Sequence, residues 1–257
     1  MGVGSGGYNS VGVFMSLEPR IEELLLLAQS AKGRVLAAKK VRDLSPNVPL
    51  EKLSELIRVL SKDPDSLEFS ELAISLAMLL ERMQEDKAIK LLEEMLGERN
   101  TRLLLGMVLG VIKASKIDID TMAELIRRLV FDEDDEVRNS ALGALRNNLS
   151  ILGKDFLIEL LSDAFSGKDK RKKEGGLILL SAFADKIPPN LLSEFILIAL
   201  EEEEDIRLKA LEILEFVLKD RLPRKTIKEI LQKAINEGSE SVKKEALKIA
   251  KDLNLSI

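Results

Sequence analysis

A small residue recurs along almost the whole sequence at intervals of 33 to 36 residues. These anchor residues, as we call them, are Ala38, Ala73, Gly106, Ala141, Gly176, Ala210 and Ala246. The positions one and three residues after each anchor are apolar in every copy, except at Lys39. Such spacing places an apolar stripe on a helix, and Ala or Gly in the stripe lets two helix backbones approach closely. A period of this length, with one such helix per unit, is typical of helical repeat proteins.

The segment 134–149 shows the repeated helix most clearly. Its acidic turn supplies a helix cap, and Val137, Arg138, Ala141 and Leu145 follow at helical spacing. This pattern resembles the second helix of a HEAT repeat, and the resemblance covers roughly residues 16–257, most closely in the second half. It implies an all-α fold, an α-solenoid of about seven two-helix repeats of about 35 residues. The tetratricopeptide repeat of similar length expects recurring aromatic positions, whereas this chain has one Tyr and no Trp.

Prolines and turn-forming residues divide the chain into the expected repeats. The predicted units are 16–44, a second that starts after 45–49, then 86–115, 118–150, 153–186, 189–219 and 223–254. All seven prolines fall at helix starts or in turns of this scheme, which agrees with the high cost of proline inside a helix. We therefore expect one domain over 16–257, preceded by a flexible, Gly-rich tail at 1–15.

Composition excludes several functional classes. The chain has no His, Cys or Trp, so disulfides, thiolate metal sites and the commonest general base are absent. No carboxylate pair stands at a spacing suited to catalysis, and we expect neither an enzyme nor a cofactor. The chain lacks an apolar run long enough to cross a bilayer, so we expect no membrane association and a cytoplasmic location. Abundant Lys and Glu with few thermolabile residues suggest a hyperthermophile.

Charge alternates between the turns of successive repeats. The turns 132–136 and 201–205 are acidic, and the turn 168–173 between them is basic. One interpretation is structural, with helix caps and an ion-pair network between stacked turns. The other makes the basic turn a docking point for an acidic partner. Its residues are Lys168, Lys170, Arg171, Lys172 and Lys173. The resemblance to HEAT repeats further implies that Arg138 and Arg207 pair with acidic residues of neighbouring repeats.

An excess of apolar residues marks three predicted second helices, at 72–80, 103–112 and 175–184. In HEAT-like solenoids the second helices line the concave face, so an exposed strip is expected two and five residues after each anchor. The candidate groove residues on this strip are Met78, Val108, Val111, Arg146, Ile178, Glu212 and Glu215. An uncovered apolar strip indicates a partner site. Helices that are apolar on all sides also occur in ordinary cores, so both alternatives remain open.

Two functions are compatible with these features. The first is a non-enzymatic scaffold that binds a partner's peptide or helix, or a second copy of the chain, in the concave groove. The second is a nucleic-acid-associated module that uses the basic turn 168–173. The net charge of −5 and the acidic turns on both sides disfavour the second function. We therefore expect a protein-interaction scaffold.

Overall fold

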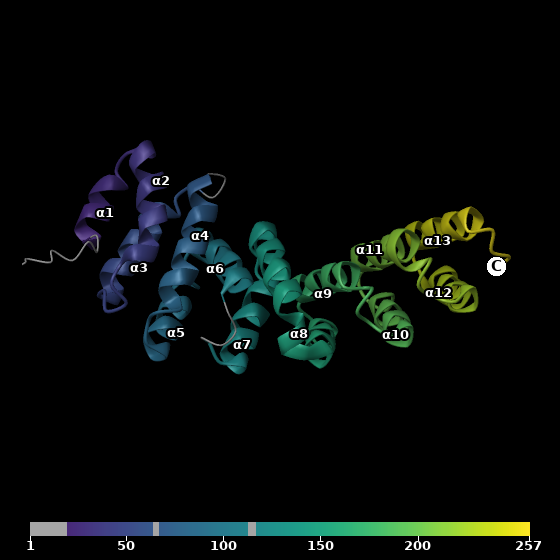
Figure 1. Ribbon diagram of the computed structural model, residues 1–257. Helices are drawn as coiled ribbons and strands as arrows, with labels where there is room; N and C mark the ends of the chain where they lie inside the picture. The colour runs from purple at the N-terminus through teal and green to yellow at the C-terminus, as the bar shows by residue number, and fades with distance from the viewer. Residues whose placement is uncertain (1–19, 64–66, 113–116) are drawn as a thin grey trace, which may run out of the picture.

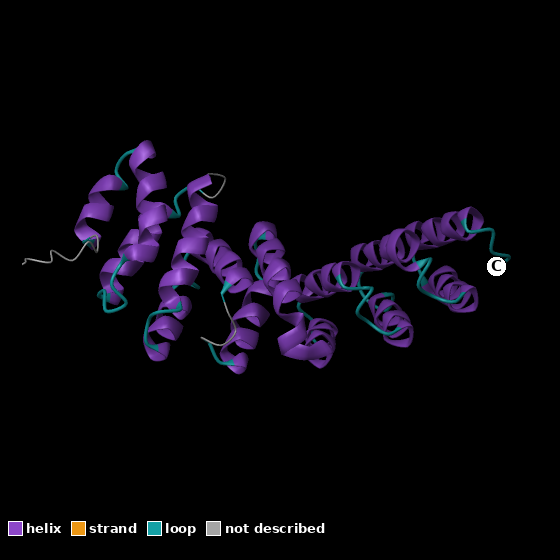
Figure 2. Cartoon of the chain, in the orientation of Figure 1, coloured by secondary structure: helices purple, strands orange, loops and turns teal. Residues whose placement is uncertain are grey.

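The computed structural model describes residues 20–63, 67–112 and 117–257, and within these ranges it is helical, with no strand (Figure 2). The glycine-rich tail at 1–15, the start of the first predicted repeat and part of the turn at 62–65 lie outside the described residues. The expectation of an all-α fold is confirmed for the part that is described. No helix of that part combines the length and the apolar character needed to span a membrane.

The helices follow one another along an elongated array (Figure 1). In chain order they are α1 (Ile21–Leu27), α2 (Ala31–Lys40), α3 (Leu50–Leu60), α4 (Leu67–Leu80), α5 (Glu85–Glu94), α6 (Arg99–Val111), α7 (Ile119–Val130), α8 (Asp135–Ser166), α9 (Lys170–Ala182), α10 (Pro189–Ala199), α11 (Glu204–Ile213), α12 (Arg224–Glu237) and α13 (Glu240–Asp252). A short 3₁₀ turn, η1 (Val41–Asp43), follows α2, and a π-helical segment, η3 (Leu214–Leu218), continues α11. Pro49, Pro188 and Pro223 stand at the N-caps of α3, α10 and α12, as the proline pattern predicted.

The long helix α8 is broken at Gly153. This residue has φ 82° and ψ 161°, a conformation that L side chains rarely adopt, and it separates a first part at 135–152 from a second part at 154–166. Gly153 is the residue at which the sequence predicted a new repeat to begin, after the previous one ended at residue 150. Each part of α8 therefore packs as a separate helix.

The anchor residues lie on helices that contact one another in series. Contacts join α2 to α4, α4 to α6, α6 to α8, α8 to α9, α9 to α11 and α11 to α13. The other helices also contact along the chain, with α1 against α3, α3 against α5, α8 against α10 and α10 against α12. Figure 1 shows the two sets of helices along opposite sides of the array. The anchor-bearing helices form one of these two sets, and a groove crosses three of them.

All seven anchors are buried, which confirms their predicted role in close packing. A Cβ atom built on Gly176 would lie 2.6 Å from the Cβ of Ala164, and one built on Gly106 would lie 1.9 Å from the Oγ of Ser140. No side chain fits at such distances without movement of its neighbours. The small residues therefore set how closely the helices approach.

A single cluster of buried, mainly aliphatic side chains runs along the array from Ile21 to Ala250. The cluster takes one face from each amphipathic helix, which is why the apolar stripes of the sequence repeat with the helices. Each helix contributes a few buried residues to a core that is long rather than spherical. Residues on the opposite side of the anchor-bearing helices, such as Met78, Val111 and Glu212, are exposed.

Candidate functional site

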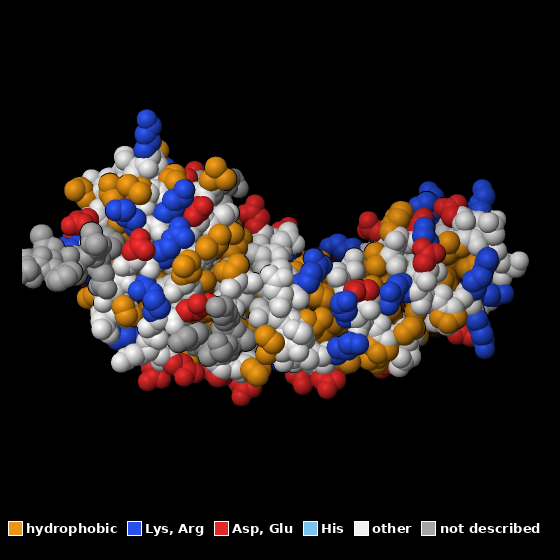
Figure 3. Space-filling view, viewed as in Figure 1, with side chains coloured by type: hydrophobic (Ala, Val, Ile, Leu, Met, Phe, Trp, Pro, Cys, Tyr) orange, Lys and Arg blue, Asp and Glu red, His pale blue; other side chains and the backbone are white. Residues whose placement is uncertain are grey.

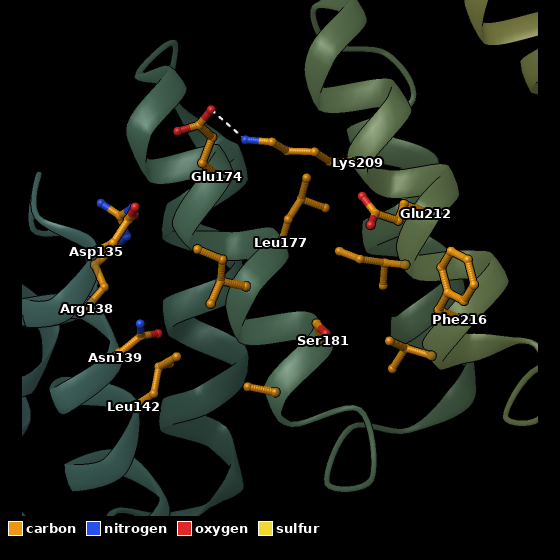
Figure 4. A pocket seen from close by; sticks show the side chains of 14 residues that line it. Asp135, Arg138, Asn139, Leu142, Glu174, Leu177, Ser181, Lys209, Glu212 and Phe216 are labelled. Atoms are coloured by element: carbon orange, nitrogen blue, oxygen red, sulfur yellow. Dashed lines mark hydrogen bonds and ion pairs between the residues drawn. The ribbon is translucent and has the colours of Figure 1, made fainter. Parts of the chain in front are cut away.

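A groove with a volume of about 770 Å³ crosses three consecutive anchor-bearing helices. The first part of α8 forms one side, α9 forms the floor, and α11 with η3 forms the other side (Figure 4). The outline of the molecule dips over α9 (Figure 3). The groove is lined by Asp135, Arg138, Asn139, Leu142, Glu174, Leu177, Ile178, Ser181, Ala182, Lys209, Glu212, Ile213, Phe216 and Val217.

One end of the groove is polar and its cations are already paired. The Nζ of Lys209 donates to Glu174 at 2.9 Å, an ion pair between α11 and α9 that is drawn in Figure 4. The guanidinium of Arg138 is paired with Asp135 and also donates to the backbone oxygen of Asp132 at 2.6 Å. Only 11% of the Arg138 side chain is exposed, whereas Asp135 is 82% exposed. These contacts hold both cations against the protein.

The other end of the groove is apolar and carries an exposed aromatic ring. Leu142, Ile178, Ile213 and Val217 are partly buried there. Phe216 is 67% exposed and lies on η3. π-Helical turns are uncommon and are found frequently at functional sites. An exposed ring above a partly covered aliphatic surface is the composition expected of a contact site for a partner protein.

Glu212 stands on the same side of the groove, one helical turn before Phe216. It is exposed, and within the described part of the chain its carboxylate makes no ion pair or hydrogen bond. The lining thus holds three carboxylates, at Asp135, Glu174 and Glu212, against two cations that are already engaged. The unmatched charge of the groove is negative.

The predicted strip enters this groove at three positions, two of which, Ile178 and Glu212, are candidate groove residues and the third of which is Ser181. Ile178 and Glu212 line the groove, and Glu215 on η3 is half-buried outside the lining. Arg146 is exposed outside the lining, with its guanidinium 5.6 Å from the ring centre of Phe183. The strip and the groove therefore coincide in the middle of the array.

The strip is also exposed farther toward the N-terminus, on α4 and α6. Met78 is 44% exposed and Val111 is 49% exposed. Val108 is fully buried, so its assignment to an exposed strip was wrong. It points into the core because the buried face of α6 is wide and includes the second position after Gly106. The sequence left open whether these apolar residues form an exposed strip or belong to the core. Both cases occur on α6, where Val111 is exposed and Val108 is buried.

Sequence reasoning missed Phe216 and the polar end of the groove. Phe216 stands six residues after Ala210, outside the two positions assigned to the strip. Phe216 follows Glu212 by one helical turn and Glu215 by one residue, and an aromatic residue next to these charges could have been noticed. Lys209 and Glu174 are 35 residues apart, the repeat period, and this spacing was a signal for a contact between adjacent helices.

The basic turn is held by the acidic turns beside it. Lys170 pairs with Asp205, Arg171 lies 3.4 Å from Glu133, and Lys173 pairs with Glu202. The remaining two residues differ: Lys172 lies 5.9 Å from the ring centre of Phe131, and Lys168 is exposed. The hydrogen bond between Lys170 and Asp205 lowers the pKa of Asp205 and raises the pKa of Lys170. The turn is thus part of the ion-pair network that the structural interpretation anticipated.

The implied roles of Arg138 and Arg207 are not observed. Arg138 pairs with Asp135 of its own helix, and Arg207 donates to the backbone oxygens of Glu202 and Glu237. The predicted pairing with carboxylates of neighbouring repeats was wrong: among the described residues the acceptors of Arg138 lie in its own helix and the turn before it, and Arg207 reaches the neighbouring α12 only at a backbone oxygen. Ion pairs between adjacent units are made by other cations, among them Arg99 and Arg102 at the start of α6, which pair with Asp134 and Asp132.

No protein-family model matches this sequence, and a comparison with curated proteins also finds no match. Within the described residues, no group of three or more Asp or Glu side chains is arranged to hold a metal ion. The character of the site therefore rests on its geometry and its charges.

Proposed function

We propose that this protein is a HEAT-like α-solenoid of about seven two-helix repeats that serves as a non-enzymatic scaffold. The period of the anchors and the serial contacts of their helices support the architecture. Stacked repeats of this kind present an extended surface to a partner, and each repeat contributes one helix to that surface.

The groove over α8, α9 and η3 is the observation that carries the function. It combines an aliphatic floor with an exposed aromatic side chain and a polar end, within one recess of about 770 Å³. Partner proteins commonly insert an apolar helix face into such a groove, with the polar rim setting the orientation. We assign the groove to the binding of a peptide or helix of another protein.

A pull-down with matched variants tests the assignment. The tagged chain, the Phe216→Ala variant and the Leu26→Ala variant are incubated with lysate of the native host, with and without nuclease. Leu26 is as exposed as Phe216, at 67%, and lies on α1 at the N-terminal end of the array, away from the groove. We expect a stoichiometric protein that survives nuclease and is retained by Leu26→Ala but lost with Phe216→Ala.

The nucleic-acid alternative predicts the opposite pattern. Capture would disappear with nuclease and would be unaffected by Phe216→Ala, and affinity would fall steeply with salt. The pairing of Lys170, Arg171 and Lys173 with carboxylates offers this alternative no support.

A further inference from the structure

We propose that the groove recognises a cationic partner segment, with a lysine or arginine seated between the carboxylate of Glu212 and the ring of Phe216. This inference rests on the proposed function of the groove and specifies the chemistry of its occupant. The side chains around the basic group would be aliphatic, since they meet Leu142, Ile178 and Val217.

The balance of charge in the groove favours a cationic occupant. Arg138 and Lys209 are paired with Asp135 and Glu174, so their positive charges are already offset within the groove. Glu212 has no such partner among the described residues. An acidic segment would be repelled there, whereas a basic one gains an ion pair.

The environments of the phenylalanine rings also favour a cationic occupant of the groove. Phe131, Phe156 and Phe183 each have a cation of the chain over the ring, at 5.9, 5.4 and 5.6 Å from the ring centre. In contrast, Phe216 is mostly exposed, and no ring or cation contact to it occurs within the described residues. A face of this kind attracts a lysine or arginine side chain.

The two groups are placed to act together. Glu212 and Phe216 are four residues apart on α11 and η3, so they lie on the same side of the helix and both line the groove. A cation between them is contacted by a carboxylate and a ring face at once. Glu212 and Phe216 together favour a basic partner over a neutral one more strongly than either side chain does alone.

The test selects the partner chemistry without assuming a sequence. A phage-displayed library of random peptides, about 15 residues long to allow about four helical turns, is panned on the full chain. Peptides are retained if they bind the wild type and not Phe216→Ala. We expect these groove-dependent peptides to be rich in Lys or Arg next to aliphatic residues.

Fluorescence anisotropy with the selected peptides then measures each contact. Glu212→Gln and Phe216→Leu are each expected to weaken binding by about tenfold, the second because leucine keeps the apolar area but lacks the ring face. Glu215→Gln is the matched control, since Glu215 is on the same helix and outside the groove lining, and its binding should be unchanged.

Three outcomes would overturn the inference. Groove-dependent peptides without basic residues, or with affinity insensitive to Glu212→Gln, would leave the scaffold function in place and remove the cationic specificity. Self-association of the chain that Phe216→Ala abolishes, measured by sedimentation velocity, would place a second copy in the groove instead. Failure to select any groove-dependent peptide would remove the proposed function together with this inference.

Discussion

Arg102 at the start of α6 donates two hydrogen bonds to the carboxylate of Asp132, which lies 30 positions later in the turn before α8. The distances are 2.7 Å from Nε to Oδ2 and 3.3 Å from the second guanidinium nitrogen to Oδ1. The side chains are 17% and 9% exposed. Asp132 also accepts from the backbone N–H of Asp134, at 3.0 Å. The pair therefore joins two successive helical units at a point that is largely shielded from water.

Replacement of Arg102 by Lys should destabilise the chain by about 1–3 kcal/mol, because a lysine cannot reproduce the two-point contact with a partly buried carboxylate. Urea unfolding followed by circular dichroism measures the change. Arg128→Lys is the control, since its pair with Glu124 is 59% and 53% exposed and should change stability by less than about 0.5 kcal/mol. Equal losses of stability in the two variants would show that the buried ion pair contributes no more to the free energy of unfolding than the exposed one.

Two glycine-to-alanine substitutions should have opposite effects on stability. Gly176→Ala places a methyl group 2.6 Å from the Cβ of Ala164 and should lower the free energy of unfolding by about 1–2 kcal/mol. Gly143 lies within α8 with no atom within 4 Å of the added Cβ, so Gly143→Ala should raise it by about 0.5–1 kcal/mol. Thermal unfolding of both variants provides the comparison. A stabilised Gly176→Ala variant would contradict the close approach of the helices.

A lysine should be tolerated at Val111 and not at Val108. Val108 is fully buried, and a charge placed there should cost about 3 kcal/mol or more and unfold the region around α6. Val111 is 49% exposed at the end of α6, so Val111→Lys should change stability by less than about 1 kcal/mol. Amide hydrogen exchange over α4, α6 and α8 locates the loss. Native-like protection in Val108→Lys would mean that the side chain is not in the core.

Low pH should lower the free energy of unfolding, partly because the Asp134 carboxylate becomes protonated. A hydrogen bond from Arg99 (2.6 Å) and backbone N–H groups at the start of α8 lower the pKa of this carboxyl below its ordinary value. Because the folded pKa is below the unfolded pKa, the stabilisation is fully present above the unfolded value and is lost as the pH falls through the folded value.

The urea midpoint of the wild type should therefore fall below about pH 4, and it should fall less steeply in Asp134→Asn. Asp155→Asn, at an exposed carboxylate without a hydrogen bond or ion pair to the described residues, is the control and should keep the wild-type slope. The same slope in Asp134→Asn and wild type would exclude Asp134 as a source of the pH dependence.

The main helices and their order followed from local chemistry that is visible in the sequence. Ala38, Ala141 and Ala246 stand on helices because apolar residues at helical spacing surround them, and prolines or acidic caps begin several of these helices. The boundary between the repeats 118–150 and 153–186 was also predicted, and the structure places the break of α8 at Gly153, where the second of these repeats begins. These features depend on neighbours within a few residues of one another, so the sequence alone determines them.

The tertiary structure decided which stripe of each helix remains exposed. Val108 and Val111 are three residues apart on α6, yet one is buried and the other is half exposed, because the rotation of the helix depends on its contacts with α4 and α8. The groove likewise requires three helices whose anchors are 35 and 34 positions apart, and Phe216, which is exposed on η3, lines it only when these helices stand side by side. Periodicity determines that helices pack, whereas the angle and depth of packing follow from side chains on different repeats that meet only in the folded chain.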